Sequence, residues 1–230
     1  MIKALAIDID GTLTFQNRQL DLEAIKAIRR AEKENLPVIL ATGNILCFAE
    51  AASVMLGTSG PVIAEDGGII LDIDDDEVYV IGDLSEIERG MNLLEEEFSN
   101  IVHTRTSEDR IAGRTLERTF DAEKATRIFR EEDLNLVAID SGFAIHIKNP
   151  EVNKGKALHK AASLINIKEP EIAAIGDGKN DVELIERAGI GIAIENSHEE
   201  LKETADHVFN QSYGSGVSAA INQILKENIE

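Results

Sequence analysis

The chain has 230 residues, a length sufficient for one large domain or two modest ones. Of these residues 43% are hydrophobic and 29% charged, which is typical of globular proteins. Its net charge of −20 argues against nucleic acid or an anionic membrane surface as a partner. The single cysteine, Cys47, excludes an internal disulfide, and no apolar run is long enough to span a membrane. Because the first strand-like run begins at Lys3, with no room for a signal peptide, we expect a cytoplasmic protein.

Strand-like and helix-like segments alternate along the first and last parts of the chain. In the first part we expect strands at 3–9, 37–41 and 61–64, a hairpin of 69–73 with 78–81, and helices at 21–34 and 46–56. After Asn153 we expect helices at 154–165, 181–188, 198–204 and 217–226, and strands at 171–175, 190–194 and 206–209. This alternation predicts a parallel sheet with helices on both faces.

The middle of the chain has a different order of elements. We expect helices at 84–98 and 121–133, a polar, basic stretch with one strand at 103–118, and paired strands at 136–139 and 143–148. Such an order indicates a small α+β module inserted into the larger fold. We therefore predict an α/β protein with a Rossmann-like parallel-sheet core domain, residues 1–81 and 153–230, and an inserted α+β cap domain, residues 82–152.

Two carboxylates follow the first predicted strand. If the strand continues through them, Asp8 and Asp10 emerge on the same side, since side chains alternate along a strand. Two neighbouring carboxylates resist ionising together unless a cation lies between them. This arrangement suits a phosphoryl-transfer site. The alternative is a simple Asp-Gly turn, but such a turn seldom needs a second acid two residues upstream.

Polar residues also follow the second strand and begin the first helix after the insert. The hydroxyl of Thr42 and the N–H groups of Gly43 and Asn44 can hold phosphate oxygens, although Thr42 or Asn44 can instead cap the next helix. Lys154 stands at a helix start, where the helix dipole disfavours a cation. Neutralising a bound phosphate would explain that position, and the alternative is a solvated surface lysine.

A second acidic pair brackets the loop after a later strand. Asp177 and Asp181 flank this loop, in which Gly176 and Gly178 permit close approach of the backbone to a ligand. All four groups of residues lie at the carboxyl ends of predicted parallel strands or in the loops beside them. Open α/β sheets bind their ligands at this edge.

The order of these motifs resembles the haloacid dehalogenase-like phosphohydrolases. The matching residues are Asp-x-Asp-Gly-Thr at 8–12, Thr42, Asn-Lys-Gly at 153–155 and Gly-Asp-Gly-x-Asn-Asp at 176–181. The chain is most similar to the branch with a sheet-containing cap between the second and third motifs. Residues 8–12, the compact cap and residues 140–146 look most like the archaeal phosphoglycolate phosphatases.

The resemblance implies a role for each motif. Asp8 would be the nucleophile that forms an aspartyl-phosphate, and Asp10 the general acid and base. Mg²⁺ would contact Asp8, the backbone carbonyl of Asp10 and Asp177, with Asp181 as a ligand or an orienting group. The substrate-binding residues would be Thr42, Gly43, Asn44 and Lys154. The metal and Lys154 would create a local positive pocket in an acidic protein.

The expected partner is a small phosphorylated metabolite. The sequence leaves open whether the protein is a monomer or a homodimer. A sugar-phosphate phosphatase or a phosphomutase would use the same chemistry, but the compact insert favours hydrolysis. A phospho-accepting signalling module is an alternative from another class, in which the insert would have no role.

The cationic residues of the predicted cap are Arg105, Arg110, Arg114, Arg118, His146 and Lys148. We expect arginines of this set to select an acid, 2-phosphoglycolate above all, unless they only balance acidic helix surfaces.

Overall fold

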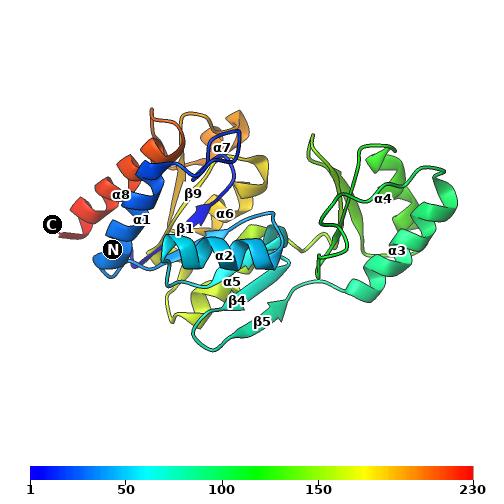
Figure 1. Ribbon diagram of the computed structural model, residues 1–230, viewed down its shortest axis with the longest axis horizontal. Coiled ribbons are helices and arrows are strands. Elements are labelled where there is room, and N and C mark those ends of the chain that lie inside the picture. Colours follow the sequence, from blue (N-terminus) through cyan, green and yellow to red (C-terminus); the bar gives the residue numbers. More distant parts are fainter. Residues whose placement is uncertain (230) are drawn as a thin grey trace. The chain divides into compact units, whose positions relative to one another are not determined.

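The computed structural model describes residues 1–229, which form two compact units (Figure 1). The first unit combines Met1–Tyr79 with Asn153–Glu230, and the second is Val80–Val152. The first contains a large sheet with helices, and the second a small sheet with two helices. The α/β fold predicted from the sequence is confirmed.

The large sheet has eight strands in the order β11-β10-β9-β1-β2-β3-β4-β5. Its strands are β1 (Ala4–Asp8), β2 (Val38–Ala41), β3 (Val62–Ala64), β4 (Ile69–Asp72), β5 (Glu77–Val80), β9 (Ile172–Gly176), β10 (Ile190–Ala193) and β11 (His207–Val208). The six strands from β11 to β3 pair in parallel, and β4 turns back antiparallel to β3. The parallel sheet therefore ends in the hairpin expected from the sequence.

Helices cover the large sheet. They are α1 (Leu22–Lys33), α2 (Leu46–Leu56), α5 (Lys154–Leu164), α6 (Val182–Arg187), α7 (Glu199–Thr204) and α8 (Tyr213–Ile229). In Figure 1, α1 and α8 run side by side, and they bury a core that includes Leu5 and Ile7 of β1. Because side chains alternate along a strand, Asp8 lies on the other side of β1 from Ile7, where it meets the start of α5.

The last helix begins earlier than its apolar pattern indicates. The sequence predicts a start near Val217, whereas α8 starts at Tyr213. Gly214 permits this extra turn, because a Cβ there would lie 2.6 Å from the Asp21 carboxyl carbon. Asp21 is the expected N-cap of α1, where its carboxylate accepts a hydrogen bond from the Glu23 amide at 2.9 Å. The starts of α1 and α8 are thus packed together.

The second unit has its own apolar core. A three-stranded antiparallel sheet, β6 (Arg114–Leu116), β8 (Ile145–Lys148) and β7 (Val137–Asp140), is joined by α3 (Leu84–Glu97) and α4 (Ala122–Glu131). Fully buried side chains from every layer meet there, including Ile87, Phe129 and Ile147. The expected strand within residues 103–118 is β6, which pairs with β8 and completes the sheet.

Several basic side chains of the second unit are bonded within it. Arg118 pairs with Asp140, with Nε 2.9 Å from a carboxylate oxygen. Arg114 donates to the backbone carbonyls of Arg110 and Gly113 at 2.9 and 2.8 Å. Their number in the sequence therefore overstates how many cationic groups are left for a ligand.

Across residues 1–229, no helix combines the length and apolar character needed to cross a membrane.

We predict that Gly155→Ala destabilises the protein by about 1–3 kcal/mol, because a Cβ there would run into the backbone carbonyl of Glu183. This close approach lets α5 pack on α6. Chemical denaturation measures the loss. Lys156→Ala, an exposed position on the same helix, is the control and should change the free energy of unfolding by less than about 0.5 kcal/mol. Equal stability of the two variants would contradict the tight packing.

Candidate active site

Polar side chains gather where three neighbouring parallel strands end. Asp8 is the last residue of β1, Thr42 follows β2, and Asp177 follows β9. The register pairs Asp8 with Ala41 on one side and Ile7 with Ile175 on the other. Motifs far apart in the sequence are therefore brought to one edge of the sheet, as the strand order requires.

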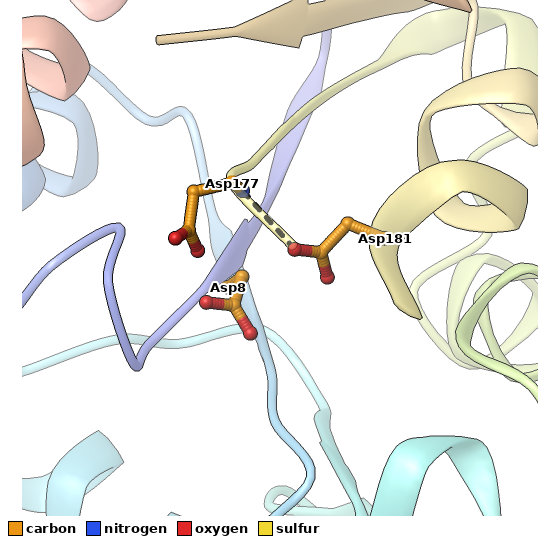
Figure 2. Close-up of side chains that lie close together, drawn as sticks. All are labelled: Asp8, Asp177 and Asp181. Carbon is orange, nitrogen blue, oxygen red and sulfur yellow. Dashed lines mark hydrogen bonds between the residues drawn. The ribbon is translucent and has the colours of Figure 1, made fainter. Parts of the chain in front are cut away.

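Three carboxylates form an acidic cluster at this edge (Figure 2). Oxygens of Asp8, Asp177 and Asp181 all lie within 4.8 Å of one another. Asp181 Oδ2 accepts hydrogen bonds from the amides of Asp177 and Gly178 at 3.1 and 2.9 Å. Thr12, which is buried, donates its hydroxyl to Asp177 Oδ1 at 3.0 Å. The backbone and a neighbouring hydroxyl thus hold two of the three carboxylates in place.

Lys154 lies within this cluster, fully buried at the start of α5. Its ammonium donates to Asp8 Oδ1 and to Asp181 Oδ1, each at 2.6 Å. Burial alone would lower the pKa of Lys154, but the charges of Asp181 and Asp8 outweigh it and raise that pKa. The lysine is therefore charged, and the two carboxylates explain a cation at a helix start. Lys156, by contrast, is exposed.

The negative charge of the cluster exceeds the single positive charge of Lys154. Asp8 Oδ2 is buried without a hydrogen-bond partner, and burial and the charge of Asp181 raise the pKa of the Asp8 carboxyl. Burial and Asp181 likewise raise the pKa of Asp177 to about 6. Hard divalent cations such as Mg²⁺ prefer oxygen ligands, so a carboxylate cluster with this excess of negative charge fits such an ion. Asp8 and Asp177 have the carboxylate oxygens best placed to hold it.

Asp10 is not one of the three carboxylates of the acidic cluster. Because β1 ends at Asp8, the alternation of a strand does not extend to Asp10, which belongs to the following turn. Its carboxylate accepts hydrogen bonds from the Asn44 side-chain amide, from Arg18 Nε at 2.9 Å and from the Thr42 hydroxyl at 3.5 Å. The turn requires Gly11, whose φ is +86° and whose Cα lies against the Asp177 carboxylate. The metal contact through the Asp10 carbonyl stays a prediction.

The loop after β2 is not built around a helix cap. The N-cap residue of α2 is Ile45, and no side chain caps that end of the helix. Neither Thr42 nor Asn44 therefore has the capping role that was the simpler alternative. Instead, Thr42 Oγ1 accepts hydrogen bonds from the Asn44 amide at 3.1 Å and from its side chain at 2.9 Å. Thr42, Asn44 and Asp10 form one hydrogen-bonded group.

Sequence reasoning missed Asp66, a buried carboxylate after β3. Its side chain accepts a hydrogen bond from Asn180 Nδ2 at 2.9 Å, and its amide donates to the Thr42 carbonyl at 3.1 Å. A Cβ on Gly43 would lie 2.9 Å from the Asp66 carboxylate. Asp66 thus ties the loop after β2 to the loop after β9. Its position after a third parallel strand is the signal that could have identified it.

We predict that Asp177→Asn stabilises the metal-free protein at pH 8. Folding raises the pKa of Asp177 from 3.8 to about 6, so this group stabilises the fold at low pH and loses that contribution as the pH rises between those values. The amide removes this loss and still accepts the Thr12 hydrogen bond. Thermal unfolding in chelator should show a gain of about 1–2 kcal/mol, or a few degrees in Tm.

The matched control for this variant is Asp75→Asn, at an exposed turn between β4 and β5, which should leave Tm unchanged. Added magnesium should raise the Tm of the parent more than that of Asp177→Asn, because the variant lacks one carboxylate of the acidic cluster. A variant less stable than the parent in chelator would contradict the repulsion inferred for the cluster.

Comparisons with known proteins identify the family of the chain. The family model described as haloacid dehalogenase-like hydrolase matches residues 5–132 and 84–221. A protein of Methanothermobacter thermautotrophicus named phosphoglycolate phosphatase is 42% identical over 97% of this chain and 99% of its own length. Another of that name, from Methanosarcina acetivorans, is 40% identical over 98% of this chain and 97% of its own length.

A solved structure extends the comparison to the fold. The crystal structure of Thermoplasma acidophilum 0175 matches with a TM-score of 0.86 and 28% identity, covering 98% of this chain and 99% of that chain. The resemblance, the α/β fold and the enzymatic character predicted from the sequence are confirmed. The chain belongs to the haloacid dehalogenase-like hydrolases.

Proposed function

We propose that the protein is a magnesium-dependent phosphatase that hydrolyses a small phosphomonoester through an aspartyl-phosphate on Asp8. The observation that carries this proposal is the buried Asp8 carboxylate, which has one oxygen on Lys154 and the other without a hydrogen-bond partner. An unpartnered carboxylate oxygen at the end of a central strand is placed to attack an incoming phosphorus atom. The division of the chain into a catalytic core and a cap is part of the same proposal.

The chain's own groups supply most of the proposed chemistry. Lys154 orients Asp8 and offsets the charge that develops on the phosphoryl oxygens, which Thr42 and the amides of Gly43 and Asn44 also contact. Bound Mg²⁺, held by Asp8, Asp177 and the Asp10 carbonyl, would add positive charge that keeps the carboxylates ionised. Both oxygens of Asp181 already accept hydrogen bonds, so we assign it the task of positioning Lys154 and the loop after β9.

Asp10 is the proposed general acid and base. It donates its proton to the oxygen of the leaving alcohol while the phosphoryl group passes to Asp8. The resulting carboxylate then takes a proton from the water that attacks the aspartyl-phosphate, which releases phosphate and restores Asp8. The hydrogen bonds from Asn44 and Arg18 hold Asp10 in one orientation for both steps.

The proposed substrate is 2-phosphoglycolate, hydrolysed to glycolate and phosphate. Two relatives that align with 97% and 98% of this chain bear the name phosphoglycolate phosphatase, which supports this choice over a sugar phosphate. The proposed partner is therefore a small phosphorylated metabolite, and we propose a cytoplasmic location.

We predict that Asp8→Asn abolishes turnover and leaves the fold intact. An amide is a poor nucleophile, and replacing a buried carboxyl whose pKa is raised removes repulsion from the acidic cluster. Activity on 2-phosphoglycolate and thermal unfolding should be measured on the same preparation, with Asp75→Asn as an active control. Substantial residual activity in Asp8→Asn would exclude the covalent mechanism.

We also predict that a chelator removes the phosphatase activity and that magnesium restores it. Calcium should restore it poorly, because its larger and more variable coordination shell disturbs the in-line geometry of phosphoryl transfer. Initial rates with each cation at matched concentrations test this. Full activity in chelator, or equal rates with calcium, would count against the proposed role of the metal.

A further inference from the structure

Arg18, in the loop between β1 and α1, contacts the proposed acid and base directly. Its Nε donates to Asp10 Oδ1 at 2.9 Å, and its Nη2 donates to Asn44 Oδ1 at 2.9 Å. The guanidinium carbon also lies 5.4 Å from the centre of the Phe48 ring. All of these residues belong to the unit that contains Asp8. The guanidinium is therefore held beside the reacting groups.

These contacts occupy only one edge of the guanidinium. A guanidinium has five N–H donors, and the Nε and Nη2 edge faces Asp10 and Asn44. Within residues 1–229, the side chain of Arg18 makes no further hydrogen bond, and 56% of that side chain is exposed. The edge formed by Nη1 and Nη2 is thus available, and its two parallel donors match the geometry of a carboxylate.

Fold stability does not explain this arrangement. Arg18 has a φ of +66° in a tight turn, which its amide closes by donating to the Phe15 carbonyl at 2.8 Å. The backbone of this turn does not need the side-chain contacts of Arg18. The ion pair with Asp10 is exposed, and exposed pairs contribute little free energy.

We propose that Arg18 is a specificity-determining residue that binds an anionic group on the leaving alcohol through Nη1 and Nη2. While the substrate is bound in this way, Arg18 Nε keeps its hydrogen bond to Asp10. This inference rests on the proposed phosphatase function and deepens it. In 2-phosphoglycolate the carboxylate carbon is two bonds from the oxygen that Asp10 protonates, so a cation bonded to Asp10 is within reach of that carboxylate. A neutral alcohol of the same size gains no such pair.

Arg18 is better placed for this task than Arg114 and Arg118 of the second unit, two of the arginines that the sequence favours. Arg118 is already paired with Asp140, and Arg114 donates to backbone carbonyls. Arg18 keeps one edge available beside the proposed general acid. The basic residue that selects the substrate therefore comes from the same unit as the nucleophile.

The test compares kcat/KM for 2-phosphoglycolate and for ethyl phosphate, which lacks the carboxylate. Arg18→Met should lose about 10- to 100-fold more on 2-phosphoglycolate than on ethyl phosphate, whose own loss measures the contribution of the hydrogen bond to Asp10. Arg18→Lys keeps the charge without the paired donors, so it should lose about tenfold on 2-phosphoglycolate. The control is Arg29→Met, which removes an exposed arginine bonded to the Met55 carbonyl and should change neither value.

Binding provides a second measurement that does not depend on turnover. Calorimetric titration of Asp8→Asn with 2-phosphoglycolate and with ethyl phosphate, in magnesium, should show tighter binding of the acid. Adding Arg18→Met to that protein should weaken binding of the acid about 10-fold or more and leave that of ethyl phosphate nearly unchanged.

The outcomes separate this inference from the proposed function. Equal losses on both substrates in Arg18→Met would mean that Arg18 only positions Asp10, which overturns the inference. A parent enzyme that hydrolyses both substrates without preferring the acid also overturns it, while the phosphatase function stands. A parent that hydrolyses neither phosphomonoester overturns the proposed function and, with it, the inference.

Discussion

The ammonium of Lys154, bonded to both Asp8 and Asp181, is the interaction on which the rest of the site depends. Three buried charges lose their hydration, and such groups seldom stabilise a fold more than apolar side chains of the same volume would. Their importance lies in the geometry that they impose. Lys154 begins α5, Asp8 ends β1, and Asp181 immediately precedes α6, so one ammonium fixes the relative positions of three elements.

The same group of charges leaves an electrostatic imbalance. Lys154 cannot neutralise three carboxylates, and burial together with that excess of negative charge raises the pKa values of Asp8 and Asp177. A site built only for stability would replace one of these carboxylates. The proposed binding of a divalent cation and then of an anionic phosphate requires all three carboxylates, at the expected expense of some stability of the metal-free protein. This also reconciles a net charge of −20 with a phosphorylated substrate, because the positive charge is needed only locally.

The sequence predicted those parts of the site that follow from regular structure. Asp8 ends an apolar strand, and Thr42 and Asp177 come directly after apolar strands. The edge of a parallel sheet brings such positions together whatever their separation in the chain. The alternation rule does not apply to Asp10, because it holds only within a strand and β1 stops at Asp8. Arg18 and Asp66 both adopt left-handed backbone conformations in loops, where periodicity carries no information about side-chain direction.

Charge patterns in the sequence were less informative than strand ends. The basic residues of the second unit stand close together along the chain, but Arg118 and Arg114 are largely satisfied by partners in their own unit. A sequence shows how many charged residues a segment has, but it does not show which of them already have partners. Arg18 is a single arginine in a short loop, without any cluster to mark it, yet it has one open edge beside Asp10. For the proposed substrate, a cation bonded to the proposed general acid is well placed for recognition, because few atoms separate the reacting oxygen from the carboxylate to be recognised.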